Sequence, residues 1–311
     1  MDMRTAHTPA GNLTAGFNLA VAVTVLATLL LSGLGQANAA PKPKLWERWT
    51  AHDPATTAQI DHGAWDRFLR TYVRPNGSGL NLVAYSKVTA EDRRALEGYL
   101  SAMAATPISR FNRAEQVAYW INLYNALTVK VILDHYPVES IRKVSISPGL
   151  FSIGPWDKKL IRIEGEDLTL NDIEHRILRP IWRDPRIHYA VNCASISCPN
   201  LMPTAFTGAN ADELMTAGAR DYINSPRGVT VRNGRLYVSS IYDWFEDDFG
   251  GTDARVIAHL REYASPELDA KLARITRVSG DDYDWDLNGV RAVEVAKTRR
   301  VYDRGFGGGG S

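Results

Sequence analysis

The chain has 311 residues, of which 45% are hydrophobic and 23% are charged, and its formal net charge is +1. This composition excludes a disordered chain, and two cysteines are too few for a multi-disulfide scaffold. Because 36 basic residues nearly balance 35 acidic ones, no nucleic-acid partner is expected.

Residues 1–39 have the pattern of a secretory signal peptide. Residues 19–31 read LAVAVTVLATLLL without a charge, and Ala37-Asn38-Ala39 supplies the small residues typical of a cleavage site. The alternative is an uncleaved anchor, although a bilayer needs about 20 apolar residues. We expect cleavage after Ala39 and a periplasmic or secreted protein with no membrane span after cleavage.

The rest of the chain divides into three parts. Residues 40–59 predict an extended N-terminal arm, whose Trp46 and Trp49 are candidates to dock on the body. Residues 60–290 have no repeat and no long linker, which indicates a single domain. Residues 291–311 predict a C-terminal extension that ends in a flexible Gly-rich tail.

Four segments predict helices. Asn112 and Glu115 form a capping pair ahead of a helix that runs to about residue 136. The same spacing occurs in Thr169 with Asp172 and in Asn210 with Glu213. Residues 253–263 predict a further helix.

Shorter segments predict strands. Residues 160–163 are one, and residues 187–191 alternate between apolar and other side chains as a strand would. Residues 229–232 and 235–239 flank Asn233-Gly234, which favours a type I′ hairpin turn. The order of these elements predicts an α+β fold with helices packed on a small, mainly antiparallel sheet.

Residues 188–200, HYAVNCASISCPN, hold both cysteines and allow three interpretations. In the first, a cysteine is a nucleophile and His188 or another histidine is its base. Alternatively, Cys193 and Cys198 form a disulfide, which export favours. The third interpretation is a zinc site of His188 and both cysteines, although its spacing matches no standard zinc motif. If the segment is a strand, His188 and Asn192 share one face.

The predicted helix over residues 112–136 carries two asparagines that share a face, Asn122 and Asn125, beside Trp120 and Tyr124. Asparagine is expensive to bury without partners. The amides therefore either hold a neighbouring loop in place or orient a substrate.

Two acidic segments complete the candidate residues. Adjacent helix positions diverge by about 100°, so Glu174 and His175 should point apart, and we expect Glu174 to pair with an arginine. Asp248 belongs to an acidic group with Asp243, Glu246 and Asp247, which is either a solvated face or the source of a carboxylate that orients a histidine.

Five blocks of the sequence carry a family resemblance, namely residues 120–127, 170–179, 188–201, 244–251 and 283–289. Together they resemble the domain-of-unknown-function 547 family over roughly residues 60–290. The family resemblance implies no activity, and similar members are exported bacterial proteins or plant proteins. A remote similarity to papain-like and transglutaminase-like folds implies a central helix on an antiparallel sheet, but here that helix has no cysteine.

The leading hypothesis is a cysteine-dependent hydrolase or acyl transferase that acts on an amide or ester of the cell envelope. Cys198 is its expected nucleophile, His188 its base and Asp248 the group that orients the base. Asn122, Asn125, Trp120 and Asn192 are expected to bind the substrate. The alternative is a non-catalytic binding or scaffold module with a structural Cys193–Cys198 disulfide. No metal or other cofactor is expected in either case.

Overall fold

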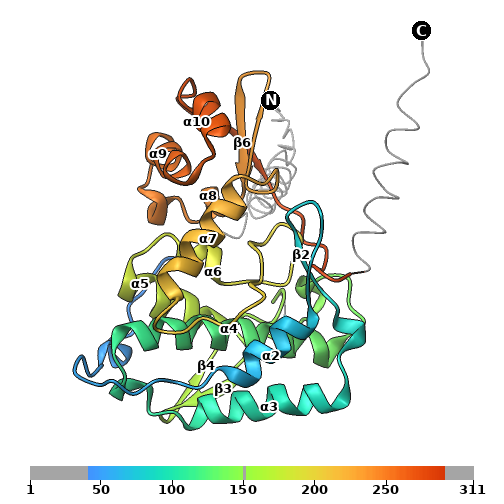
Figure 1. Ribbon diagram of the computed structural model, residues 1–311, viewed down its shortest axis with the longest axis vertical. Coiled ribbons are helices and arrows are strands. Elements are labelled where there is room, and N and C mark those ends of the chain that lie inside the picture. The colour runs from blue at the N-terminus through green and yellow to red at the C-terminus, as the bar shows by residue number, and fades with distance from the viewer. Residues whose placement is uncertain (1–40, 150–151, 291–311) are drawn as a thin grey trace, which may run out of the picture. The chain divides into compact units, whose positions relative to one another are not determined.

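The computed structural model describes residues 41–149 and 152–290, which lie in one unit of the chain (Figure 1). The predicted signal peptide and the C-terminal extension lie outside the described residues. The described helices are α2 (Gly63–Tyr72), α3 (Ala90–Ala105), α4 (Arg113–His135), α5 (Arg179–Trp182), α6 (Ile187–Ala190), α7 (Ala211–Ile223), α8 (Ile241–Trp244), α9 (Asp253–Tyr263) and α10 (Pro266–Leu272).

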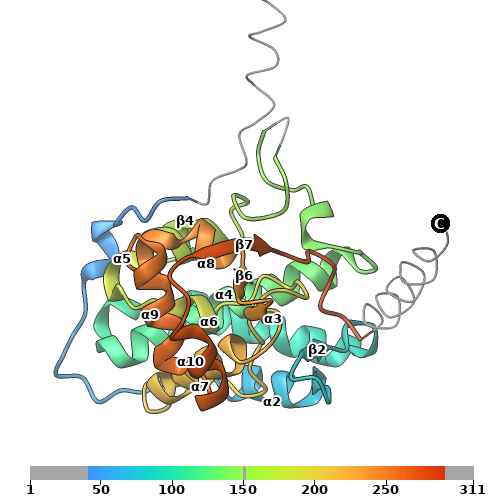
Figure 2. The same cartoon turned by 90° about the horizontal axis from the view of Figure 1, so that it is seen from above.

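Three small sheets accompany these helices, so the predicted α+β class is confirmed. Two sheets are antiparallel pairs, β1 with β2 and β3 with β4. In the third, β6 pairs antiparallel with β5 and parallel with β7. Figure 2 shows β6 beside β7. The strands are β1 (Val73–Pro75), β2 (Asn81–Val83), β3 (Ile161–Ile163), β4 (Glu166–Leu168), β5 (Val229–Arg232), β6 (Arg235–Ser239) and β7 (Val278–Asp282).

Helix α4 is the centre of the core, with α3 on one side and α7 on the other (Figure 1). It begins where predicted, because the Asn112 side chain accepts a hydrogen bond from the Glu115 N–H at 3.0 Å. Every side chain from Glu115 to Val129 is buried. In a helix that is covered on all sides, polar side chains must find hydrogen-bond partners within the protein, and this applies to Asn122 and Asn125.

The hairpin and the helix of residues 253–263 also form as predicted. Asn233 and Gly234 have φ of +51° and +69°, as a type I′ turn requires, and join β5 to β6. Helix α7 forms too, but Asn210 does not cap it through its side chain. Asn210 Oδ1 instead accepts from the Thr207 N–H at 2.7 Å.

The strand predicted over residues 187–191 is wrong, because Ile187–Ala190 form the short helix α6. The Ile187 N–H bonds the Asp184 carbonyl at 3.1 Å and starts the turn. All four side chains of α6 are buried. The alternating pattern of residues 187–191 therefore belongs to a helix that is buried on all sides, not to a strand with one buried face. His188 and Asn192 consequently do not share a strand face.

The N-terminal arm packs on the core. The Lys44 and Trp46 N–H groups bond the carbonyls of His175 and Arg176 at 2.9 and 3.0 Å. Trp49 is 3% exposed and meets Trp120 edge to face, with ring centroids 5.1 Å apart. The expected docking of the two arm tryptophans is therefore found, and it holds this segment beside the candidate site.

Candidate functional site

Cys193 is the one residue of the segment 187–202 that is not buried. Its neighbours Asn192 and Ala194 are 3% and 0% exposed, and Cys198 is 5% exposed. Ala194 has φ of +58°, a left-handed conformation that costs a non-glycine residue about 1 kcal/mol or more. We call residues 193–198 the cysteine loop. Its turn is strained and presents one thiol at the surface.

Three side-chain groups surround the Cys193 sulfur. The Cys198 Sγ lies 2.9 Å from it, and the Ser195 Oγ and Tyr283 hydroxyl each lie 3.2 Å from it. The Cys193 N–H also donates to the Cys198 Sγ at 2.8 Å. Both cysteines are free thiols. The disulfide considered above is therefore not formed in the structure, although its two sulfurs are adjacent.

The two thiols differ in acidity. Burial raises the pKa of the Cys193 thiol, but the hydrogen bonds that its sulfur shares with Cys198, Ser195 and Tyr283 outweigh burial, and the net pKa lies below the ordinary value. Burial and the neighbouring Cys193 raise the pKa of the Cys198 thiol well above its usual range. Cys193 is therefore the more acidic thiol of the pair.

Asparagine side chains hold the cysteine loop from the α4 side. Asn125 Nδ2 donates to the Ala190 carbonyl at 2.9 Å, and its Oδ1 accepts from the Asn192 N–H at 2.8 Å. Asn192 in turn accepts from the Ala194 N–H at 2.9 Å and donates to the Pro199 carbonyl at 2.7 Å. Each of the two amides thus donates one hydrogen bond to, and accepts one from, backbone groups of the segment that holds the cysteines.

The same geometry changes the roles expected for the other predicted binding residues. Asn122 bonds the N–H and the carbonyl of Phe206, and it is completely buried. Trp120 is 1% exposed and packs between Trp49 and Tyr119. Neither side chain reaches the surface. The structure therefore assigns positioning roles to Asn122 and Asn125, and a core role to Trp120.

Residues 283–288, which we call the terminal strip, cover the cysteine loop. The Ile196 and Ser197 N–H groups bond the carbonyls of Asp286 and Asp284 at 2.8 and 3.1 Å. The Asn288 N–H bonds the Ala194 carbonyl at 3.1 Å. This pairing brings the Tyr283 hydroxyl to the Cys193 sulfur across 90 residues of sequence. Sequence reasoning missed Tyr283 and Ser195, although both stand in blocks singled out for the family resemblance.

His188 and Asp248 meet as predicted. His188 Nε2 lies 2.7 Å from Asp248 Oδ2, and Arg179 Nε lies 2.5 Å from the same oxygen. Burial raises the pKa of the Asp248 carboxyl, but hydrogen bonds from His188 and Arg179 outweigh it and lower the pKa to about 2. The His188 ring stacks on Phe245 at 4.2 Å between centroids. This arrangement fixes the imidazole rigidly.

Glu174 lies beside this pair. Its Oε1 is 3.9 Å from Nδ1 of both His188 and His175, and no arginine pairs with it among the described residues. The predicted arginine bridge is therefore wrong, and so is the expected divergence of Glu174 and His175, because residues 172–178 form a π-helix. Arg179 donates to His175 Nδ1 at 2.9 Å instead.

Tyr124 connects Glu174 to the cysteine loop electrostatically. Burial raises the pKa of its phenol well above 10, and the charges of Glu174, Cys193 and Cys198 raise it further. Among the described residues, His188 contacts Asp248, Glu174 and aromatic rings, but neither cysteine. The structure therefore assembles the His–Asp pair and the thiol pair as neighbouring groups and not as one contiguous triad.

Half-buried aromatic side chains lie beside the Cys193 thiol. The Tyr283 ring is 4.8 Å from Trp244 and 4.6 Å from Trp285, and Trp156 meets Trp285 at 5.8 Å, between centroids. The Arg142 guanidinium lies 5.2 Å from the Trp285 ring centroid. We call Trp156, Trp244, Tyr283 and Trp285 the aromatic cluster. It offers partly exposed apolar surface next to the reactive sulfur.

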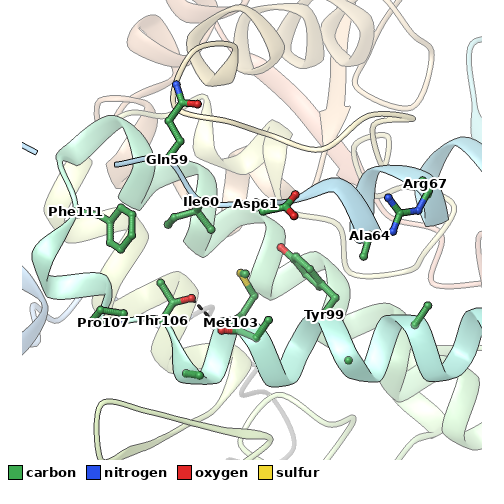
Figure 3. A pocket seen from close by; sticks show the side chains of 14 residues that line it. Gln59, Ile60, Asp61, Ala64, Arg67, Tyr99, Met103, Thr106, Pro107 and Phe111 are labelled. Atoms are coloured by element: carbon green, nitrogen blue, oxygen red, sulfur yellow. Dashed lines mark hydrogen bonds between the residues drawn. The ribbon is translucent and has the colours of Figure 1, made fainter. Parts of the chain in front are cut away.

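A separate hollow of about 730 Å³ opens between residues 59–61, α2 and α3 (Figure 3). None of the predicted site residues lines it. Its walls are mostly apolar, with Asp61 and Arg67 as the charged side chains. The side chains labelled in the figure are Gln59, Ile60, Asp61, Ala64, Arg67, Tyr99, Met103, Thr106, Pro107 and Phe111.

Within residues 41–149 and 152–290, no three His, Cys, Asp or Glu side chains gather in a way that could hold a metal ion. The zinc interpretation also loses its histidine, because His188 lies with Asp248 and not with the cysteines. In the same part of the chain, no helix is long and apolar enough to cross a bilayer.

Comparison with known proteins gives one match. Residues 108–223 match the family described as "Protein of unknown function, DUF547". This segment contains α4, Glu174, His188 and the cysteine loop, so the match covers most of the site. No curated protein and no solved structure matches the chain. The papain-like similarity therefore stays a prediction.

Proposed function

Residues 108–223 match the DUF547 family, whose function is unknown, and from the cysteine loop within that segment we propose that the chain is a cysteine-dependent hydrolase or acyl transferase. One observation carries the proposal. Cys193 is the only surface-reaching residue of a buried, strained segment, and three hydrogen-bonding side chains converge on its sulfur. Such an environment is typical of a reactive thiolate and not of a structural cysteine.

The nucleophile is accordingly Cys193 and not Cys198. A nucleophile must touch the substrate, and Cys198 is 5% exposed beneath its partner. The Cys193 sulfur attacks the acyl carbon, a C–S bond forms, and the bond to the leaving oxygen or nitrogen breaks. The leaving group takes a proton from the Cys198 thiol or from the Tyr283 hydroxyl, which both contact the sulfur.

Water or a second nucleophile then cleaves the thioester and returns a proton to the donor. The hydrogen bonds around the Cys193 sulfur lower the pKa of its thiol, which favours the thiolate without direct contact with a histidine. His188 and Asp248 are positioning residues in this proposal. They fix α6, whose Ala190 carbonyl and following Asn192 N–H are held by Asn125.

The aromatic cluster supplies the substrate surface. Tyr283 belongs both to this cluster and to the shell around the Cys193 sulfur, so a group packed on the rings lies next to the thiol. The predicted signal peptide supports a site of action in the cell envelope, where amides and esters of the wall and membrane are available. Cell fractionation of the full chain tests this location.

The activity test uses p-nitrophenyl acetate and p-nitrophenyl butyrate with the full chain. We expect turnover of more than one equivalent and a transient acyl adduct on Cys193, detected by intact mass and peptide mapping. Cys193→Ser should abolish both. Cys198→Ser is the matched control: a serine hydroxyl can still accept from the Cys193 N–H and still donate a proton to the leaving group, so the loop should fold and acylation of Cys193 should persist.

Turnover that survives in Cys193→Ser would refute the proposal. Acylation that stops at one equivalent would also refute it, because it would show a reactive thiol without catalysis. In that case the aromatic cluster and the cysteine loop would belong to a binding module.

A further inference from the structure

Beyond acyl transfer, we propose that Cys193 and Cys198 form a reversible dithiol–disulfide couple that exchanges with disulfides of other molecules. The inference rests on the placement of the two sulfurs and on the bonds that hold the loop around them, so it stands whether or not the acyl chemistry occurs.

The two sulfurs are placed for a bond to form and break. They lie 2.9 Å apart, and a disulfide needs about 2.05 Å, so closure requires a shift of less than about 1 Å. Four residues separate the cysteines, and so short a loop gives a disulfide little of the stabilisation that long loops give. A bond at this place is therefore poorly suited to stabilising the fold.

The loop does not need the bond to keep its shape. Asn192 ties Ala194 to Pro199 across it, and the terminal strip bonds the Ile196 and Ser197 N–H groups. Arg227 Nη1 also donates to the carbonyls of Ile196 and Cys198 at 3.0 and 2.6 Å. The reduced loop is therefore held in one conformation by these hydrogen bonds, and reduction of a Cys193–Cys198 disulfide would leave them in place.

The two cysteines divide the roles that exchange requires. Cys193 reaches the surface and meets the incoming disulfide, whereas Cys198 is buried directly behind it. The attacking thiol must be accessible, and the resolving thiol needs contact only with its partner. The asymmetry in exposure therefore fits a defined order of events.

In the first step, the Cys193 thiolate attacks one sulfur of a substrate disulfide, R–S–S–R. A Cys193–S–S–R bond forms and one R–S⁻ leaves. In the second step, the Cys198 thiol loses its proton to solvent or to the departing thiolate and attacks the Cys193 sulfur. The internal disulfide forms and the second R–S⁻ leaves. The protein dithiol is oxidised and R–S–S–R is reduced to two thiols.

Ser195 and Tyr283 set the direction of the couple. Both bond the Cys193 sulfur in the reduced form, and stabilising the reduced form makes a disulfide a stronger oxidant. Removing one such bond, in Tyr283→Phe, should favour the disulfide about tenfold or more in its equilibrium with glutathione. Tyr237→Phe is the control, since Tyr237 lies on β6 and does not contact the cysteines.

The test equilibrates the reduced full chain in glutathione and glutathione disulfide mixtures, followed by acid quenching, N-ethylmaleimide labelling and intact mass. We expect two labels under reducing conditions, none under oxidising conditions, and full return on adding glutathione, with unchanged circular dichroism. Cys198→Ser should trap one glutathione on Cys193. Cys193→Ser should leave Cys198 unmodified in the folded protein.

Three results would overturn the couple. The first is a Cys198→Ser variant that traps no glutathione, and the second is a Cys193→Ser variant that takes up glutathione equally well. The third is an oxidised pair that is reducible only after unfolding. Ester turnover is measured separately on the reduced protein. A chain that passes this test and hydrolyses no ester would refute the acyl-transfer proposal alone.

Discussion

Asn125→Leu tests the claim that α4 holds the cysteine loop through this amide. Asn125 is 2% exposed, and its side chain bonds the Ala190 carbonyl and the Asn192 N–H. Leucine has a similar size and cannot form either bond. Both backbone groups are then left buried without partners.

Each buried polar group left unsatisfied costs about 1–3 kcal/mol, so the two together predict a loss of about 2–6 kcal/mol in the free energy of unfolding. A loss of that size is a large fraction of the stability of an ordinary domain. Asn125→Asp keeps the acceptor for the Asn192 N–H but loses the donor to the Ala190 carbonyl and buries a carboxylate beside that oxygen. Because burial of an unpaired charge is costly, we expect a loss at least as large at pH 7, and a smaller loss at low pH, where the carboxyl is protonated.

The assay is urea denaturation followed by tryptophan fluorescence, together with the rate at which Cys193 reacts with iodoacetamide. Lys130→Ala on the same helix is the control, because Lys130 pairs only with Asp134 at the surface and should change stability by less than about 1 kcal/mol. The reasoning is refuted if Asn125→Leu unfolds at the same urea concentration as the control and alkylates at the wild-type rate.

Three further predictions follow from the same structure. Asp248→Asn removes the ion-pair partner of Arg179, whose side chain is 3% exposed, so we expect a loss of about 3–5 kcal/mol by urea denaturation, whereas the exposed Asp247→Asn should be neutral. Tyr283→Phe removes a hydrogen-bond partner of the Cys193 sulfur and should raise the pKa of the thiol, seen as slower alkylation at pH 7; an unchanged pH–rate profile would contradict this. Burial lowers the pKa of His62, His175 and His259 from 6.5 to about 4. The unfolded chain therefore binds more protons than the folded protein between pH 6.5 and pH 4, and the free energy of unfolding should fall by about 2 kcal/mol per histidine between pH 6.5 and pH 5. A urea midpoint that does not move over that range would argue against three buried neutral histidines.

The contact between His188 and Asp248 could be predicted from the sequence, because the histidine and the carboxylate lie in two of the blocks that resemble the same family. Their other neighbours could not. Arg179 and Glu174 are close to each other in sequence, yet Arg179 bonds Asp248 while Glu174 faces two histidines. The π-helical turn of residues 172–178 decides which way each side chain points, and no local pattern in the sequence signals it.

Local interactions were readable from the sequence by itself. The Asn112 cap, the apolar run of α4, the Asn233-Gly234 turn and the helix of residues 253–263 depend on contacts within a few residues, and each formed as predicted. The tertiary structure alone decided that residues 187–190 are helical and that Cys193, not Cys198, reaches the surface. It also decided that Tyr283 contacts the thiol. These features depend on which distant segments cover the cysteine loop, and burial by a distant segment leaves no periodicity in the sequence that it covers.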